Sequence, residues 1–195
     1  MRTHRHLPDP LAQRGITMIE VLITIVIVAF GLLGVASLQA RMQLAEIEAY
    51  QRAQAIVLLQ DMVNRINANR KNAMAYAGAA VGTDNTVQDC AGLTGAPLDL
   101  CEWNNALLGA TETSGGGQNV GTMIGARGCI TNTVATMPRE FVVAVVWQGL
   151  NPTQVPASTT CGQNQYGNEA MRRAMVANVK IGCLQNDAAG VCVTP

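Results

Sequence analysis

The feature that most constrains this 195-residue chain is a stretch without any charged residue, residues 21–40. A helix of about 20 residues rises ~30 Å, which matches the hydrocarbon core of a bilayer. Arg2, Arg5 and Arg14 precede the stretch, and Arg41 is the first charge after it. We therefore expect a membrane-spanning helix. The positive-inside rule places its N-terminal side in the cytoplasm and the rest of the chain outside.

A cleaved secretory signal peptide is the alternative explanation of a basic leader followed by an apolar segment. The apolar segment is longer than the usual h-region of such a peptide. A cut is also expected before this segment rather than after it, so that the apolar residues would stay with the mature protein.

One carboxylate, Glu20, interrupts the apolar sequence that begins at Ile16. An acidic side chain costs roughly 2.5–3.5 kcal/mol at the centre of a bilayer and less near its edge. Such a residue usually has a partner. The α-amino group created by a cut after Gly15 would supply one, in the same chain or on a neighbouring copy.

The sequence Gly15-Ile16-Thr17-Met18-Ile19-Glu20 resembles the class III signal of type IV prepilins and of type II secretion pseudopilins. The resemblance implies that a prepilin peptidase cuts between Gly15 and Ile16 and methylates Ile16, which stands where the family usually has Phe. It also implies that Glu20 is the assembly carboxylate, pairing with the N-terminus of a neighbouring subunit.

Further stretches are similar to the type IV pilus modification protein, the PilV family of minor pilins: residues 31–34, 38–41, 49–52, 54–55, 61–70, 141–149 and 171–173. This resemblance implies a low-abundance structural subunit that primes pilus assembly at the bacterial inner membrane. Its partners would be other minor pilins, the major pilin and the prepilin peptidase. The alternatives are a minor pseudopilin of a type II secretion system, and a bitopic periplasmic adhesin or binding module.

The composition argues against an enzyme. Both histidines, His4 and His6, lie in the leader, so a mature chain would have no histidine for acid–base catalysis or zinc binding. No P-loop or dinucleotide-binding motif is present. Without the leader the chain has 10 basic and 12 acidic residues, which gives no basic field for nucleic acid. We expect no catalytic residues, no cofactor, no metal and no nucleic-acid partner.

Residues 16–72 are predicted to form one long helix, because no proline occurs between Pro10 and Pro97. Apolar residues beyond Arg41 recur mostly every three or four positions and are expected to form its packing stripe: Ala45, Ala49, Ala53, Ile56, Val57, Val63 and Ile66. The intervening polar residues are expected on wetter faces: Glu46, Glu48, Gln51, Arg52, Gln60, Asp61 and Arg65. A coiled-coil homodimer is an alternative, although the stripe lacks Leu at both seam positions.

Strands are expected late in the chain, at residues 129–134, 140–149 and 175–181, whereas residues 78–128, with Gly115-Gly116-Gly117, are expected to form loops. The expected fold is therefore α+β and type IV pilin-like, a long N-terminal helix packed against a small C-terminal antiparallel β-sheet. We divide the chain into a leader (1–15), a transmembrane or filament-core half of the helix (16–40), an amphipathic half (41–76) and a disulfide-containing head (77–195).

Six cysteines follow the helix, on the side expected to be oxidising: Cys90, Cys101, Cys129, Cys161, Cys183 and Cys192. They are candidates for up to three disulfides. Sequence cannot choose among the 15 possible pairings, although Cys90–Cys101 would close a short loop. A metal site is the weaker interpretation, because there is no CxxC pair and the acids between residues 84 and 102 fit no EF-hand loop.

Overall fold

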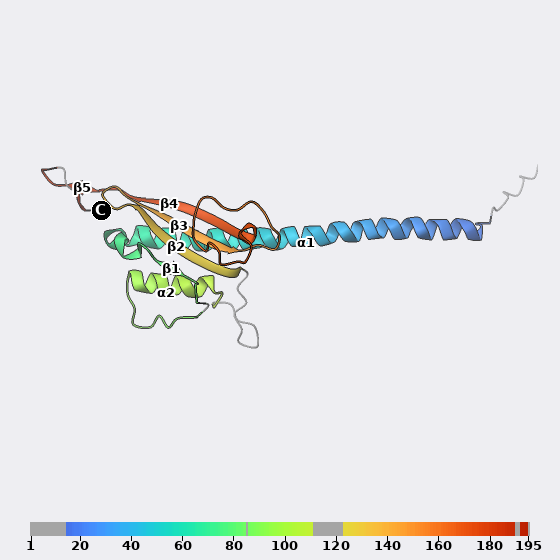
Figure 1. Cartoon of the computed structure of the whole chain (residues 1–195), viewed down its shortest axis with the longest axis horizontal. Helices are drawn as coiled ribbons and strands as arrows, with labels where there is room; N and C mark the ends of the chain where they lie inside the picture. Colours follow the sequence, from blue (N-terminus) through green and yellow to red (C-terminus); the bar gives the residue numbers. More distant parts are fainter. Residues whose placement is uncertain (1–14, 85, 111–122, 190–191, 195) are drawn as a thin grey trace, which may run out of the picture. The chain divides into compact units, whose positions relative to one another are not determined.

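The computed structural model describes residues 15–84, 86–110, 123–189 and 192–194. The chain divides into two compact units, Met1–Gln43 and Leu44–Pro195, and we call the second unit the head. Helix α1 (Met18–Ala68) has 51 residues and contributes to both units (Figure 1). The predicted long helix is confirmed, but it ends four residues early and continues as the 3-10 helix η1 (Arg70–Tyr76).

The head contains a four-stranded sheet in the order β1-β2-β3-β4, with every neighbouring pair antiparallel. Its strands are β1 (Ala80–Val81), β2 (Ile124–Val134), β3 (Arg139–Gln148) and β4 (Arg172–Ile181). The short strands β5 (Gln185–Asn186) and β6 (Cys192–Thr194) form a separate pair. The three strands expected from sequence are therefore confirmed, and each begins earlier than expected.

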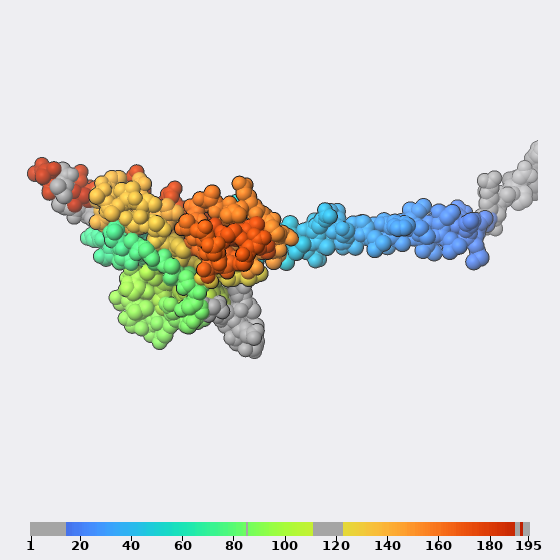
Figure 2. Space-filling view, viewed as in Figure 1, coloured from blue at the N-terminus to red at the C-terminus, as the bar shows by residue number. Residues whose placement is uncertain are grey.

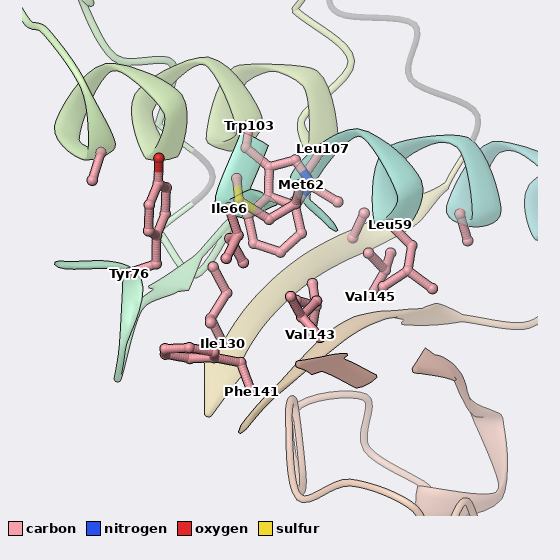
Figure 3. Packing of buried hydrophobic residues seen from close by; sticks show 14 of the residues in the cluster. Leu59, Met62, Ile66, Tyr76, Trp103, Leu107, Ile130, Phe141, Val143 and Val145 are labelled. Carbon is pink, nitrogen blue, oxygen red and sulfur yellow. The ribbon is translucent and has the colours of Figure 1, made fainter. Parts of the chain in front are cut away.

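Strand β3 is buried on both faces, which explains its nearly continuous apolar sequence. Phe141, Val143 and Val145 lie on the face that packs against the helices (Figure 3). Ala144 and Val146 lie on the opposite face, in a second cluster with Cys161 and Tyr166. The sheet is thus the middle layer of the head.

The packing stripe predicted for α1 was largely wrong. The helix buries Gln51, Ala55, Leu59, Met62 and Ile66, which recur every three or four residues, whereas Ile56 and Val57 are exposed. The prediction failed because Gln51, which is only 2 % exposed, was assigned to a wet face from its polarity. Of the predicted stripe, only Ile66 is fully buried and Val63 is partly buried.

The sequence analysis also missed helix α2 (Ala96–Leu107), which lies where only loops were expected. Pro97 occupies its first turn, where its missing N–H leaves no hydrogen bond unmade. Trp103 of α2 is fully buried, and its indole N–H donates to the Leu58 carbonyl of α1 at 3.0 Å. The triple glycine at 115–117 lies outside the described residues.

The segment between β3 and β4 covers the second face of the sheet. Figure 2 shows its atoms, in orange, gathered into one mass beside the first turns of α1 in the head. Glu48 of α1 accepts hydrogen bonds from the backbone N–H groups of Leu150 and Asn151 at 3.2 and 3.3 Å. The same carboxylate pairs with Arg173 of β4 at 3.2 Å, so one acid joins helix, segment and strand.

Close packing of α2 on the sheet requires glycine at position 128. A Cβ there would lie 2.4 Å from Cη2 of Trp103 and 2.9 Å from Cδ1 of Leu107. We predict that Gly128→Ala lowers the free energy of unfolding by about 1–3 kcal/mol. Gly182→Ala is the matched control, because its Cβ would meet nothing within 4 Å. Urea unfolding of the full chain in detergent micelles, followed by tryptophan fluorescence, measures both; equal stability of the two variants would contradict this packing.

Candidate functional site

The N-terminal segment of the described chain is exposed to solvent. Gly15, Ile16 and Thr17 precede α1 and are exposed. The Thr17 carbonyl accepts hydrogen bonds from the N–H groups of Glu20 and Val21, at 3.1 and 3.3 Å, and so begins the helix. Glu20 lies in the first turn, where the positive end of the helix dipole favours an acid.

Helix α1 exposes apolar side chains on all sides through the first unit. Large apolar residues from Ile16 to Leu44 are between 44 % and 86 % exposed. In the part of the chain that the structure describes, α1 is the one helix long and apolar enough to cross a membrane, by length and composition. Such a surface requires a covering, either lipid or other protein.

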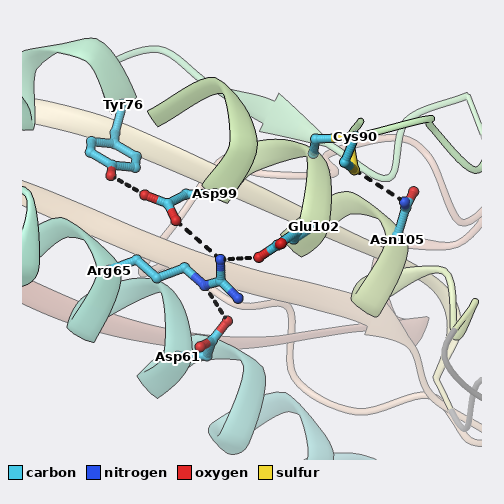
Figure 4. Close-up of polar contacts among 8 residues, drawn as sticks. Asp61, Arg65, Tyr76, Cys90, Asp99, Glu102 and Asn105 are labelled. Carbon is cyan, nitrogen blue, oxygen red and sulfur yellow. Dashed lines mark hydrogen bonds and ion pairs between the residues drawn. A yellow bond between two sulfur atoms is a disulfide. The ribbon is translucent and has the colours of Figure 1, made fainter. Parts of the chain in front are cut away.

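A guanidinium joins α1 to α2 in the head. Arg65 of α1 donates to Asp61 at 2.9 Å, to Asp99 at 3.1 Å and to Glu102 at 2.5 Å (Figure 4). Tyr76 of η1 donates its hydroxyl hydrogen to Asp99 and accepts a hydrogen bond from Asn69 at 3.1 Å. We call these residues the Arg65 cluster.

Two groups of the Arg65 cluster, Arg65 and Tyr76, have raised pKa values. Burial alone would lower the pKa of Arg65, but its carboxylate hydrogen bonds, led by that to Glu102, raise the pKa above its ordinary value. Burial, followed by the hydrogen bond to Asp99, raises the pKa of Tyr76 to about 12. Two of the acids considered for calcium, Asp99 and Glu102, thus bind an arginine. Among the described residues, no group of three His, Cys, Asp or Glu side chains is arranged so that it could hold a metal ion.

A second guanidinium organises the segment between β3 and β4. Arg172 is 2 % exposed and donates to the Thr159 and Cys161 carbonyls at 2.8 and 3.1 Å and to the Pro156 carbonyl at 3.2 Å. Its Nε lies 2.8 Å from Glu169. The Asn164 N–H and the charge of Arg172 lower the pKa of Glu169. We call these residues the Arg172 cluster.

The six cysteines form three disulfides in the structure: Cys90–Cys101, Cys129–Cys161 and Cys183–Cys192. The first attaches the segment before α2 to that helix. The second attaches the segment organised by Arg172 to β2, with Cα atoms 5.9 Å apart. The third closes the short β5–β6 pair. The first two disulfides therefore fasten a connecting segment to a neighbouring element.

Two family models match the chain. The prokaryotic N-terminal methylation motif matches residues 11–36, and the model described as type IV pilin Tt1218 matches residues 37–104. Together these matches cover residues 11–104 and support a type IV pilin. No curated protein and no solved structure matches the chain. Pilins are structural subunits that assemble with other pilins in a pilus, and the exposed apolar half of α1 fits membrane anchoring and incorporation into such a filament.

The methylation motif covers the segment in which the sequence analysis placed Gly15, Ile16 and Glu20. These residues belong to the first unit, whereas the six cysteines belong to the head. Sequence reasoning missed the Arg65 and Arg172 clusters of this pilin. The spacing of Asp61 and Arg65, four residues apart on a helix, was the one available signal for the first. The acceptors of Arg172 are mostly backbone carbonyls, which leave no sequence pattern.

We predict that Arg172→Met destabilises the pilin head by on the order of 3 kcal/mol, because it leaves several backbone carbonyls and Glu169 without their donor. The control is Lys180→Met, which breaks a 2.7 Å ion pair with Glu140 whose side chains are 65 % and 41 % exposed. An exposed pair contributes about 0–1 kcal/mol. Urea unfolding of both variants in micelles measures this difference. Similar losses of the free energy of unfolding in the two variants would show that the buried contacts of Arg172 stabilise the head no more than an exposed ion pair does.

Proposed function

We propose that this pilin is a minor pilin of the PilV type, which takes part in the assembly and priming of the type IV pilus. Prepilin peptidase cuts the chain between Gly15 and Ile16 and methylates the new N-terminus of Ile16. The mature subunit then joins other minor pilins and the major pilin. Its contribution is structural, and no catalytic step is assigned to it.

The observation that carries the processing and assembly steps of this proposal is the position of Glu20 relative to Gly15, whereas the PilV type rests on the similar stretches between residues 31 and 173. Both residues lie within the matched methylation motif, and no charged residue follows Glu20 until Arg41. In a covered, apolar environment an unpaired carboxylate would be unfavourable by several kcal/mol. A free, methylated amino group on a neighbouring subunit supplies the compensating charge.

We further propose that residues 1–15 face the cytoplasm, that residues 16–40 span the bacterial inner membrane, and that the head lies in the periplasm. Arg2, Arg5 and Arg14 precede the apolar segment, which supports this orientation. Three disulfides in the head also fit an oxidising compartment. The amphipathic half of the helix, residues 41–76, then links the membrane segment to the sheet.

The first test is the intact mass of the protein purified from membranes, with and without the prepilin peptidase. We expect a mature chain that begins at Ile16 and carries one methyl group, and the full chain when the peptidase is absent. A chain that retains residues 1–15 in peptidase-positive cells would favour a bitopic adhesin instead. Loss of secretion rather than of pili in a deletion strain would favour a type II pseudopilin.

The second test concerns the assembly carboxylate. We expect Glu20→Ala to leave cleavage intact and to reduce incorporation into sheared pili at least tenfold, because the amino group of the neighbour loses its partner. Glu46→Ala is the matched control, an exposed acid on the same helix beyond the apolar segment. Immunoblots of the pilus and membrane fractions measure the share of each variant that enters the pilus. Equal incorporation of both variants would remove Glu20 from the assembly mechanism.

A further inference from the structure

A polar hollow of about 440 Å³ lies on the face of the sheet that the segment between β3 and β4 covers. Its lining includes Thr83, Arg127 and Cys129, together with Thr160, Gln163 and Gln165. Arg127 and Cys129 are two residues apart on β2, so their side chains lie on the same face. The volume falls within the range typical of small-molecule sites, about 300–1,000 Å³.

Arg127 is the charged group of this polar hollow, and no acidic side chain pairs with it among the residues that the structure describes. The ion pairs among the described residues involve Arg65, Arg172, Arg173 and Lys180 but not Arg127. Its Nε is shielded from solvent and has no hydrogen-bond acceptor. Tyr166 lies close by, but burial raises its pKa to about 12, so it stays neutral and supplies no counter-charge.

The other polar side chains of the hollow are neutral. In the described part of the chain, the hydroxyls of Thr83 and Thr160 and the amides of Gln163 and Gln165 make no side-chain hydrogen bond to another residue. Hydroxyls and amides both donate and accept hydrogen bonds, which matches the hydroxyl groups of a sugar. One guanidinium beside them matches one carboxylate.

The hollow is also preorganised. The Cys129–Cys161 disulfide fixes its floor, and Arg172 binds the carbonyls of Thr159 and Cys161, the two neighbours of Thr160. Tyr166 donates its hydroxyl hydrogen to the Gly125 carbonyl at 2.9 Å and so fastens the far end of the segment to β2. A rigid set of polar groups loses little entropy when a ligand binds.

We propose that this hollow binds a carboxylated sugar, with the carboxylate on Arg127 and the hydroxyl groups on the Thr and Gln side chains. A phosphate fits less well, because a dianion calls for a second cation or a nest of backbone N–H groups. The carboxylate can come from a uronic acid or from a sialic acid. The chemistry that the hollow recognises is common to both.

The test is isothermal titration of the full chain in detergent micelles with D-galacturonic acid, N-acetylneuraminic acid, D-galactose and inorganic phosphate. We expect saturable binding of at least one acid, at least tenfold tighter than that of galactose or phosphate. The better acid identifies the source of the carboxylate. Absence of binding by both acids, or equal binding of galactose or phosphate, would overturn the proposal.

Variants then locate the site. We expect Arg127→Gln to weaken binding of the acid at least tenfold, and Gln163→Ala, at an exposed position, to weaken it several-fold. Arg52→Gln is the matched control, an exposed arginine of α1 that lines a different hollow. Should Arg127→Gln unfold, as its tryptophan fluorescence would reveal, Gln163→Ala alone decides the location. Unchanged binding of the acid by whichever of Arg127→Gln and Gln163→Ala folds would overturn the proposed site. An equal loss of affinity in Arg52→Gln would overturn it as well.

Discussion

The whole protein depends on a change in the surface of one helix. From Met18 to Leu44 the large apolar side chains of α1 are exposed on every side, whereas from Gln51 onward the helix buries a single face in the head. Water cannot stably cover the first kind of surface, and a small sheet can cover only the second. Membrane or filament must therefore be part of the environment in which this pilin is stable.

The head compensates for a modest apolar core with polar and covalent connections. Aromatic residues make up only 4 % of the chain. Trp103, Tyr76 and Phe141 are nevertheless fully buried, each between elements that are distant in sequence. Two arginine clusters and the disulfides then attach the long connections to this core. Arg65 joins two helices through carboxylates, whereas Arg172 shapes a segment through its backbone, so similar side chains perform different structural tasks.

The sequence predicted the elements that contain a continuous apolar or β-branched run. The charge-free run at 21–40 predicted the apolar half of α1, and the β-branched run at 140–149 predicted β3. The buried face of α1 could not be read from polarity, because Gln51 is buried and Val57 is exposed. Helix α2 escaped prediction because Gly, Asn and Thr dominate its surroundings, although Pro97 in its first turn was a local signal of a helix start. The close approach of Trp103 to Gly128 joins residues that are distant in sequence. Long-range packing of this kind leaves no local signal.

The parts of the chain that match family models differ in role from the parts that do not. The matched regions, residues 11–36 and 37–104, contain the whole of α1 and most of α2. These elements carry the apolar surface and the Arg65 cluster, which any subunit of a filament needs. Arg127, on the covered face of the sheet, and Gln163 and Gln165, in the segment between β3 and β4, lie beyond both regions. Substitutions on this face leave the assembly helix α1 unchanged. Recognition of a ligand and assembly into a filament are therefore physically separable properties of one chain.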